Sequence, residues 1–184
     1  MSTGRLVHIQ TVNQTSAAAT VSLTGASDNA VHVVMFNNLK TSSDTKNPRL
    51  RLTKTSDSSA DSTSNYDSIT RSLRTDTTYN YGSGTNGTSW SIGNVGTGSD
   101  GQEVINGFFY IYNLFDSSAF AYCTTEVMYL NHGGVLFGQM GGGNHKVTQS
   151  NNGVQFLEGS GDTITGKFSL YKVMLWVVIF LKMQ

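Results

Sequence analysis

The sequence predicts an all-β fold, a single antiparallel β-sandwich of the jelly-roll kind. Short apolar runs alternate with loops rich in Ser, Thr, Asn and Gly, and no stretch has the periodicity of an amphipathic helix. Residues 152–173 show the pattern best, because apolar and polar residues alternate, the turn Glu-Gly-Ser-Gly-Asp follows, and the alternation then resumes. The 184 residues suit one domain, which at this length buries enough surface to form a core.

Apolar–polar alternation with β-branched or aromatic residues marks the individual strands, and Gly, Asn, Asp and Pro mark the turns between them. Alternation is clearest in Thr20–Leu23 and Arg49–Thr53, as expected of strands with one buried face. Turn signals include residues 86–87 (Asn-Gly), 100–101 (Asp-Gly) and the triple glycine 141–143. The predicted strands are, in order, Leu6–Val12, Ala18–Leu23, Val31–Asn37, Arg49–Thr53, Thr77–Tyr81, Ser89–Ile92, Val104–Phe115, Ala119–Leu130, Gly134–Met140, Val154–Leu157 and Ile164–Val173.

Two polar stretches have too few apolar residues to form core and are predicted to be long loops. The first covers residues 56–64 and leads to Tyr66, which is placed to pin it. The second covers residues 82–101, in which Trp90 and Ile92 return the chain to the core. Loops of this length often carry function or subunit contacts.

Residues 173–181 are continuously apolar. A helix that spans a membrane needs about 18 or more such residues, and this run is rich in β-branched and aromatic residues, so we predict a strand buried on both faces. The chain therefore divides into a β-sandwich domain, residues 1–173, and an apolar extension, residues 174–184, that completes the core or pairs with a neighbouring subunit. Trp176, Val178 and Phe180 are the candidate subunit contacts.

Charge and cysteine content exclude several classes of protein. Twelve basic and twelve acidic residues cancel, so no basic surface is expected for nucleic acid. A near-neutral surface offers little repulsion between copies, which suits a subunit of an assembly. Cys123 is the only cysteine, predicted to be a buried and inert thiol, so no intramolecular disulfide is expected. The first six residues contain no apolar leader, which predicts synthesis in a cytoplasm.

No motif in the sequence assembles a catalytic or cofactor-binding site. Residues 82–87 and 96–101 match Gly-x-Gly-x-x-Gly, but strand-like residues follow where a dinucleotide site needs a helix. The Gly-x-Ser-x-Gly elbow of serine hydrolases is missing from the sequence. We therefore predict a protein that is not an enzyme and that uses no cofactor and no catalytic residue.

The histidines predict no metal site. His132 and His145 flank the predicted strand 134–140 and could meet at one edge, but two histidines without a matched carboxylate make a poor zinc site. Both are therefore interpreted as polar loop residues. His8 and His32 lie within strand-like runs and are interpreted as ordinary strand residues.

The carboxylates are scattered along the chain. Asp57 and Asp61 lack the spacing of a calcium-binding loop. Glycosidase chemistry needs two carboxylates that face each other across a cleft; a pair such as Glu126 with Glu158 stays open, and nothing in the sequence favours it.

Residues 108–115 form the longest aromatic run. On a strand the run divides into Phe108, Tyr110 and Tyr112 on one face and Phe109 and Ile111 on the other. Because both faces are apolar, a central core strand is predicted in preference to a ligand platform.

Four motifs are spread along residues 6–173. They are Phe36-Asn37-Asn38, Ser56-Asp57 followed by Tyr66, Phe109-Tyr110-Ile111-Tyr112-Asn113, and a last hairpin that pairs Val154-Gln155-Phe156 with Gly166-Lys167-Phe168-Ser169-Leu170-Tyr171. Together they resemble the small β-sandwich virion proteins of tailed bacteriophages, particularly those of marine phages. Members of that family usually end just after the last strand, so residues 174–184 depart from the pattern.

The resemblance implies a non-enzymatic structural subunit on the outside of a virion, present in several copies. Its implied partners are other copies of the chain and other virion proteins, in a tail or fibre-type appendage. Capsid decoration is the nearest alternative. From the residues themselves, another alternative is a carbohydrate-binding adhesion module in which Tyr66, Tyr79, Tyr81 and Trp90 hold host surface glycans. A glycan hydrolase is a third and less favoured alternative.

Overall fold

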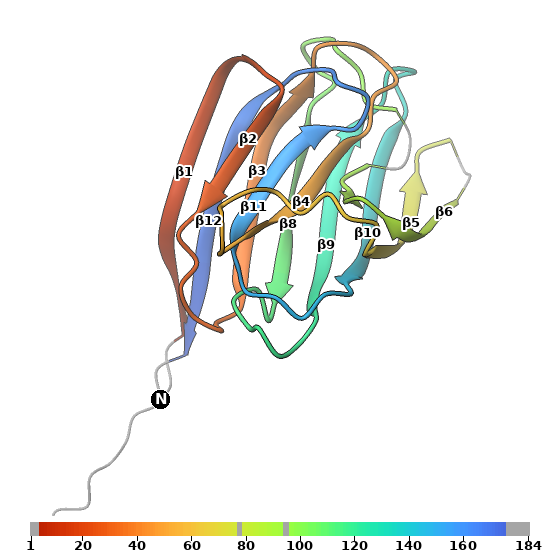
Figure 1. Cartoon of the computed structure of the whole chain (residues 1–184). Coiled ribbons are helices and arrows are strands. Elements are labelled where there is room, and N and C mark those ends of the chain that lie inside the picture. Colours follow the sequence, from red (N-terminus) through yellow and green to blue (C-terminus); the bar gives the residue numbers. More distant parts are fainter. Residues whose placement is uncertain (1–3, 77–78, 94–95, 176–184) are drawn as a thin grey trace, which may run out of the picture.

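The computed structural model describes residues 4–76, 79–93 and 96–175, which form two antiparallel sheets (Figure 1). None of the described residues forms a helix that is long and apolar enough to cross a membrane. The strands are β1 (Gly4–Ala18), β2 (Thr20–Thr24), β3 (His32–Thr41), β4 (Pro48–Lys54), β5 (Tyr66–Arg74), β6 (Asn80–Gly87), β7 (Trp90–Ser91), β8 (Ile105–Tyr112), β9 (Ala121–Leu130), β10 (Leu136–His145), β11 (Asn151–Glu158) and β12 (Ile164–Leu175).

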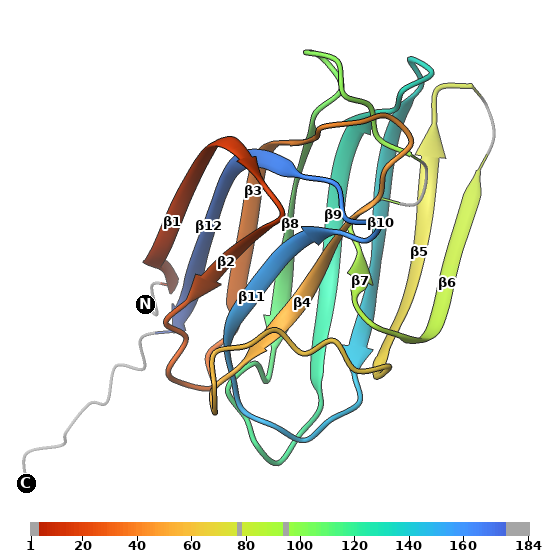
Figure 2. The same cartoon turned by 45° about the horizontal axis from the view of Figure 1, so that its top comes forward.

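The two sheets differ in size, and this difference shapes the molecule. The large sheet has eight strands in the order β1-β12-β3-β8-β9-β10-β5-β6, and the small sheet has four in the order β2-β11-β4-β7. The small sheet lies across one face of the large sheet, which Figure 2 shows with β2, β11 and β4 in front. The fold confirms the predicted all-β sandwich. No described element covers the opposite face of the large sheet.

The core lies between the two sheets and is built from the inward residues of each strand. Phe156 of the small sheet reaches Phe36 and Phe168 of the large sheet, with ring centroids 5.7 Å and 4.6 Å apart. Phe36 also lies 6.2 Å from Phe109, so the aromatic contacts run on to β8. All four rings are fully buried. Each ring contributes about 1.5–3 kcal/mol relative to an exposed position. Together the four rings hold the two sheets against each other.

Two strands depart from the sequence-based prediction. Most of β6 (Asn80–Gly87) occupies residues predicted to be the start of the second long loop, so the loop prediction is wrong there. β5 was not predicted at all. Its inward positions include Thr70 and Ser72, which are buried although they are polar. The strand therefore lacks the apolar alternation that marks its neighbours, and its pairing with β10 and β6 is a tertiary property.

The triple glycine 141–143 lies inside β10 and makes no turn, so that part of the turn prediction is wrong. The reason is crowding. A Cβ atom on Gly143 would lie 2.7 Å from the indole nitrogen of Trp90, closer than real Cβ contacts allow. Glycine thus lets the backbone of β10 pass over the Trp90 ring. Residues 86–87, the other predicted turn, are the last two residues of β6, and Asn86 has a positive φ of 55°.

Two expectations about strand ends also differ from the structure. The predicted strand 104–115 ends at Tyr112, because Asn113 turns the chain at a φ of 57°. The strand predicted for residues 173–181 is described only as far as Leu175, the last residue of β12. Residues 176–184, including Trp176, Val178 and Phe180, lie outside the described part of the chain.

Candidate functional site

The face of the large sheet that points away from the small sheet is exposed, and we call it the outer face. β9 shows the division between the two faces most clearly, because alternate residues from Ala121 to Tyr129 are buried and those between them are exposed. The exposed residues include large apolar side chains, which we call the apolar patch. Its members are Met35, Ile69, Leu73, Tyr110, Tyr112, Tyr122, Met128 and Met140.

The apolar patch is large for a soluble monomer. Its eight side chains are between 37% and 67% exposed. With about 200 Å² for each large side chain, they present about 750 Å² of apolar surface to solvent. The largest apolar patch on a typical monomer measures about 300–600 Å² and is often functional. The outer face is therefore the first candidate for a binding surface.

One row of outward residues crosses the whole large sheet. The register of the strands sets each member directly opposite the next, so their order in space follows from the hydrogen-bonded pairing alone. Near its middle, Met140 lies between Glu126 on β9 and Arg71 on β5. The full row is Thr11, Ser169, Met35, Phe108, Glu126, Met140, Arg71 and Tyr81.

Two shallow hollows lie on either side of this row. The first, of about 680 Å³, is lined by Phe108, Tyr110, Tyr112, Glu126 and Met140 among others. The second, of about 430 Å³, is lined by Leu73, Met128 and Gly138 and shares the residues Phe108, Glu126 and Met140 with the first. At Gly138 a Cβ atom would meet nothing within 4 Å. The missing side chain lowers the surface between Met128 and Leu73.

The aromatic run on β8 is exposed on one side, contrary to the sequence-based interpretation. Phe109 and Ile111 are buried as expected, but Tyr110 and Tyr112 are each 37% exposed on the outer face. The prediction that both faces of this strand belong to the core is therefore wrong. The described residues form only two layers, so the face of the large sheet that points away from the small sheet has no partner layer.

Two of the four predicted glycan-binding aromatics lie in the core. Tyr66 and Trp90 are both 1% exposed and pack edge to face, with ring centroids 5.4 Å apart. Trp90 Nε1 donates a hydrogen bond to the Asn144 carbonyl at 3.1 Å. Their assignment to an exposed glycan platform is therefore wrong, whereas the expectations that Trp90 returns its loop to the core and that Tyr66 pins the preceding loop agree with their burial.

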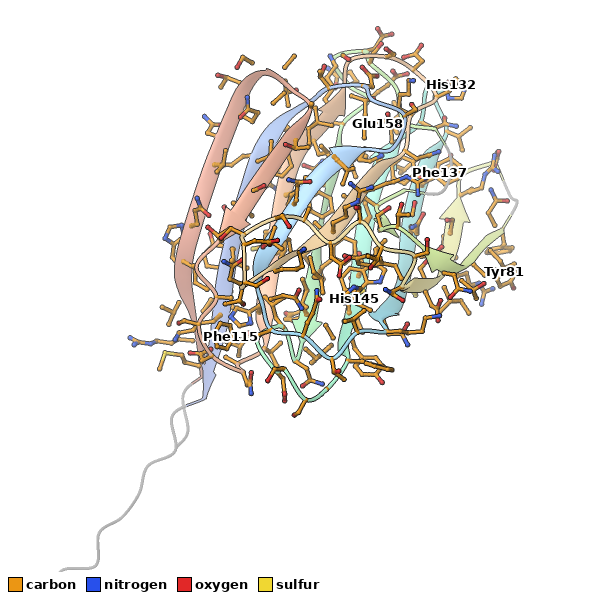
Figure 3. All side chains as sticks on the ribbon, in the orientation of Figure 1. Tyr81, Phe115, His132, Phe137, His145 and Glu158 are labelled. Carbon is orange, nitrogen blue, oxygen red and sulfur yellow. The ribbon has the colours of Figure 1, made fainter. Side chains whose placement is uncertain are left out.

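The other two predicted glycan-binding residues, Tyr79 and Tyr81, are 60% and 75% exposed. The guanidinium of Arg71 lies over both rings, 5.3 Å from the centroid of Tyr79 and 5.6 Å from that of Tyr81. These contacts turn Arg71 towards β6, the edge strand of the large sheet, where Figure 3 labels Tyr81. An exposed aromatic and cationic cluster thus borders the outer face.

A buried network pins the polar loop 55–65 to the core. Asp61 is 4% exposed, and its carboxylate lies 3.1 Å from Nε2 of the fully buried His145. Tyr66 completes the attachment, because its hydroxyl donates to the Asp61 carbonyl at 2.9 Å and accepts from the Leu52 amide at 3.0 Å. The interpretation of His145 as a loop residue is therefore wrong; Figure 3 shows it inside the sandwich.

Burial and charge set the protonation of this pair. Burial lowers the pKa of His145 below its ordinary value, against the attraction of Asp61. Burial also opposes ionisation of Asp61, but hydrogen bonds from Thr63 and Gln149 to the carboxylate favour its charged form, and the pKa of that carboxyl is lowered. A neutral imidazole beside a carboxylate inside the core supports structure, because substrate has no access to it.

His132 does not meet His145. It follows β9 at the other end of β10, where its ring nitrogen Nδ1 lies 3.1 Å from the Gly96 carbonyl. Among residues 4–76, 79–93 and 96–175, no group of three or more His, Cys, Asp or Glu residues is placed to hold a metal ion.

Most carboxylates in loops bind the backbone of their own turn. Glu158 accepts hydrogen bonds from the Ser160 amide and hydroxyl, and Asp116 does the same with Ser118. Glu126 and Glu158, the pair left open by the sequence, lie on different sheets. Glu126 projects from the outer face, whereas Glu158 closes β11 and is occupied by its turn.

Cys123 is buried, as predicted. Burial raises the pKa of its thiol to about 12. The thiolate that nucleophilic chemistry requires is therefore scarce at neutral pH.

Comparisons with protein-family models, with curated proteins and with solved structures found no match to this chain. The geometry of the outer face is thus the principal guide to function.

Proposed function

We propose that the chain is a non-enzymatic structural subunit of a bacteriophage virion, of the tail or fibre-appendage type, and that it assembles with further copies of itself. The observation that carries self-assembly is the apolar patch on the uncovered face of the large sheet. The link to a virion rests on the sequence motifs described above.

The balance of exposed and buried groups supports a structural role. The outer face presents Tyr, Met, Ile and Leu side chains with one acid and one base in the central row, a composition typical of interfaces. The groups best suited to catalysis are instead buried or already bonded. His145 contacts Asp61, the Cys123 thiol is buried in the core, and Glu158 accepts a hydrogen bond from the backbone of its own turn.

The virion assignment is tested by locating the chain in particles. Immunogold labelling with an antibody against this chain, applied to particles released from cells that produce it, is expected to mark tails or their fibres. Gold on heads would favour capsid decoration. Particles that contain none of the chain, judged by mass spectrometry of purified particles, would overturn the proposal.

A carbohydrate-binding adhesion module is a second candidate, favoured by exposed Tyr79 and Tyr81. Exposed aromatic rings beside a guanidinium offer both stacking and hydrogen bonding to a sugar. Binding on a glycan array that is lost in Tyr81→Ala and kept in Tyr112→Ala would support this role. A folded protein that binds no glycan on the array would count against it.

A further inference from the structure

The charged residues of the outer face are arranged so that the face is complementary to a second copy of itself. In the central row, Glu126 stands one strand before Met140 and Arg71 stands one strand after it. Neighbouring strands are about 4.8 Å apart, so the backbone positions of the acid and the base lie at equal distances on either side of β10. A rotation of 180° about a line along β10 would exchange their positions. The Arg71 guanidinium itself leans towards β6, over the Tyr79 and Tyr81 rings, and has to turn towards the interface to meet an acid there.

We infer that two copies of the chain pair outer face to outer face, about a two-fold axis that runs along β10 over Met140. This pairing rests on the proposed function as an assembling subunit and adds its geometry. In such a pair, Glu126 of one copy lies opposite Arg71 of the other, twice over by symmetry. The two Met140 side chains meet on the axis, and the ion pairs flank them.

Repulsion between like charges excludes two-fold axes along the strands on either side of β10. A two-fold axis along β9 sets Glu126 against its own copy, and one along β5 sets Arg71 against its own copy. Like charges placed opposite each other in an interface cost several kcal/mol and suppress the wrong pairing. The axis along β10 alone joins opposite charges.

The apolar residues fit the same axis. Leu73, Gly138 and Met128 lie in one row, with Gly138 on β10. The rotation therefore sets Leu73 of one copy against Met128 of the other, apolar against apolar. At Gly138, where a Cβ atom would meet open space, two backbones face each other and the sheets come close together.

The area is also sufficient. A stable interface buries about 800 Å² on each partner. Without Met35 the apolar patch offers about 690 Å², and Glu126, Arg71 and the other outward residues of the paired strands add to it. The axis along β10 places β9 over β5 and β8 over β6 of the other copy, which covers every member of the apolar patch except Met35, on β3. Aligned sheets of this kind pack about 10 Å apart.

Charge reversal tests the pairing. Glu126→Arg gives a face with two bases, and Arg71→Glu gives a face with two acids. In sedimentation velocity, the self-association of each variant alone should be weaker than that of the wild type by a factor of about ten or more. An equimolar mixture of the two should form heterodimers, because each base then meets an acid. The double variant Glu126→Arg/Arg71→Glu should regain the wild-type dimer.

A matched control lies on the same face. Lys167 on β12 is exposed outside the paired strands, so Lys167→Glu changes the charge as Arg71→Glu does and should leave the dimer intact. Thermal unfolding of each variant separates loss of pairing from loss of fold.

Three outcomes would overturn the inference: a wild-type chain that is monomeric at all concentrations, single variants that still dimerise, or a mixture that stays monomeric while the wild type pairs. In the last two cases the wild type still assembles, so the proposed structural role survives and only this pairing fails. Virion labelling that finds no chain would reject the proposed role whatever the pairing.

Discussion

Replacement of Tyr66 by Phe isolates the buried attachment of the polar loop 55–65. The change removes one oxygen, which accepts from the Leu52 amide and donates to the Asp61 carbonyl. The ring keeps its contacts with Trp90 and His145, at centroid distances of 5.4 Å and 4.5 Å. The variant therefore tests the two hydrogen bonds with little change in packing.

The magnitude follows from the two groups left without their partner. A buried donor or acceptor that loses its hydrogen bond costs about 1–3 kcal/mol, so Tyr66→Phe should lower the free energy of unfolding by about 2–6 kcal/mol. With a denaturant slope of about 2 kcal/mol per M of urea, the midpoint of urea unfolding should fall by about 1–3 M.

The assay is equilibrium urea unfolding followed by tryptophan fluorescence, at one protein concentration for all variants because association adds to apparent stability. Tyr81→Phe is the matched control: the same atom is removed from a ring that is 75% exposed, and the free energy of unfolding should change by less than about 0.5 kcal/mol. Equal effects of the two changes would refute the account of Tyr66 as a core anchor.

Two further predictions concern the core and pH. Gly143→Ala should destabilise the fold by about 1–3 kcal/mol in the same assay, because the new Cβ atom would lie 2.4 Å from the Asp67 carbonyl oxygen and 2.7 Å from Trp90 Nε1, whereas Gly101→Ala, in an exposed turn outside the proposed interface, meets open space and should be neutral; equal losses would contradict this packing. Burial lowers the pKa values of His145 and His32 below 6.5 in the folded state. The unfolded chain thus binds more protons, and stability should fall as the pH drops below about 6.5. His145→Gln should flatten this dependence between pH 7.5 and 5.5 and the exposed His8→Gln should not; an unchanged slope in His145→Gln would contradict it.

Alternation along the chain predicted most of the fold, because antiparallel strands with one buried face repeat every two residues. β4 and β9 show this clearly. β5 was not predicted, because its inward residues Thr70 and Ser72 are polar. Its place in the sheet depends on β10, which lies more than sixty residues later in the sequence.

The outer face was not predicted because periodicity does not say how many layers cover a sheet. β8 is apolar on both sides, and only the two-layer arrangement shows that Tyr110 and Tyr112, on the side away from the small sheet, face solvent. The row through Glu126, Met140 and Arg71 needs the register of three strands, two of which are adjacent in the sequence and one remote. For Tyr66 and Trp90 the sequence indicated both a structural role and a glycan-binding role, and only their contact across the core decides between the two.

Chemical cross-linking between copies tests most directly that the outer face is an assembly surface. Met140→Cys places a thiol on the proposed axis, and Tyr81→Cys places one on β6, about 10 Å to the side of it in each copy. Buried Cys123 adds no reactive thiol. A short bismaleimide should join Met140→Cys chains into covalent dimers and leave Tyr81→Cys chains single. Efficient cross-linking of Tyr81→Cys with none of Met140→Cys would contradict the account.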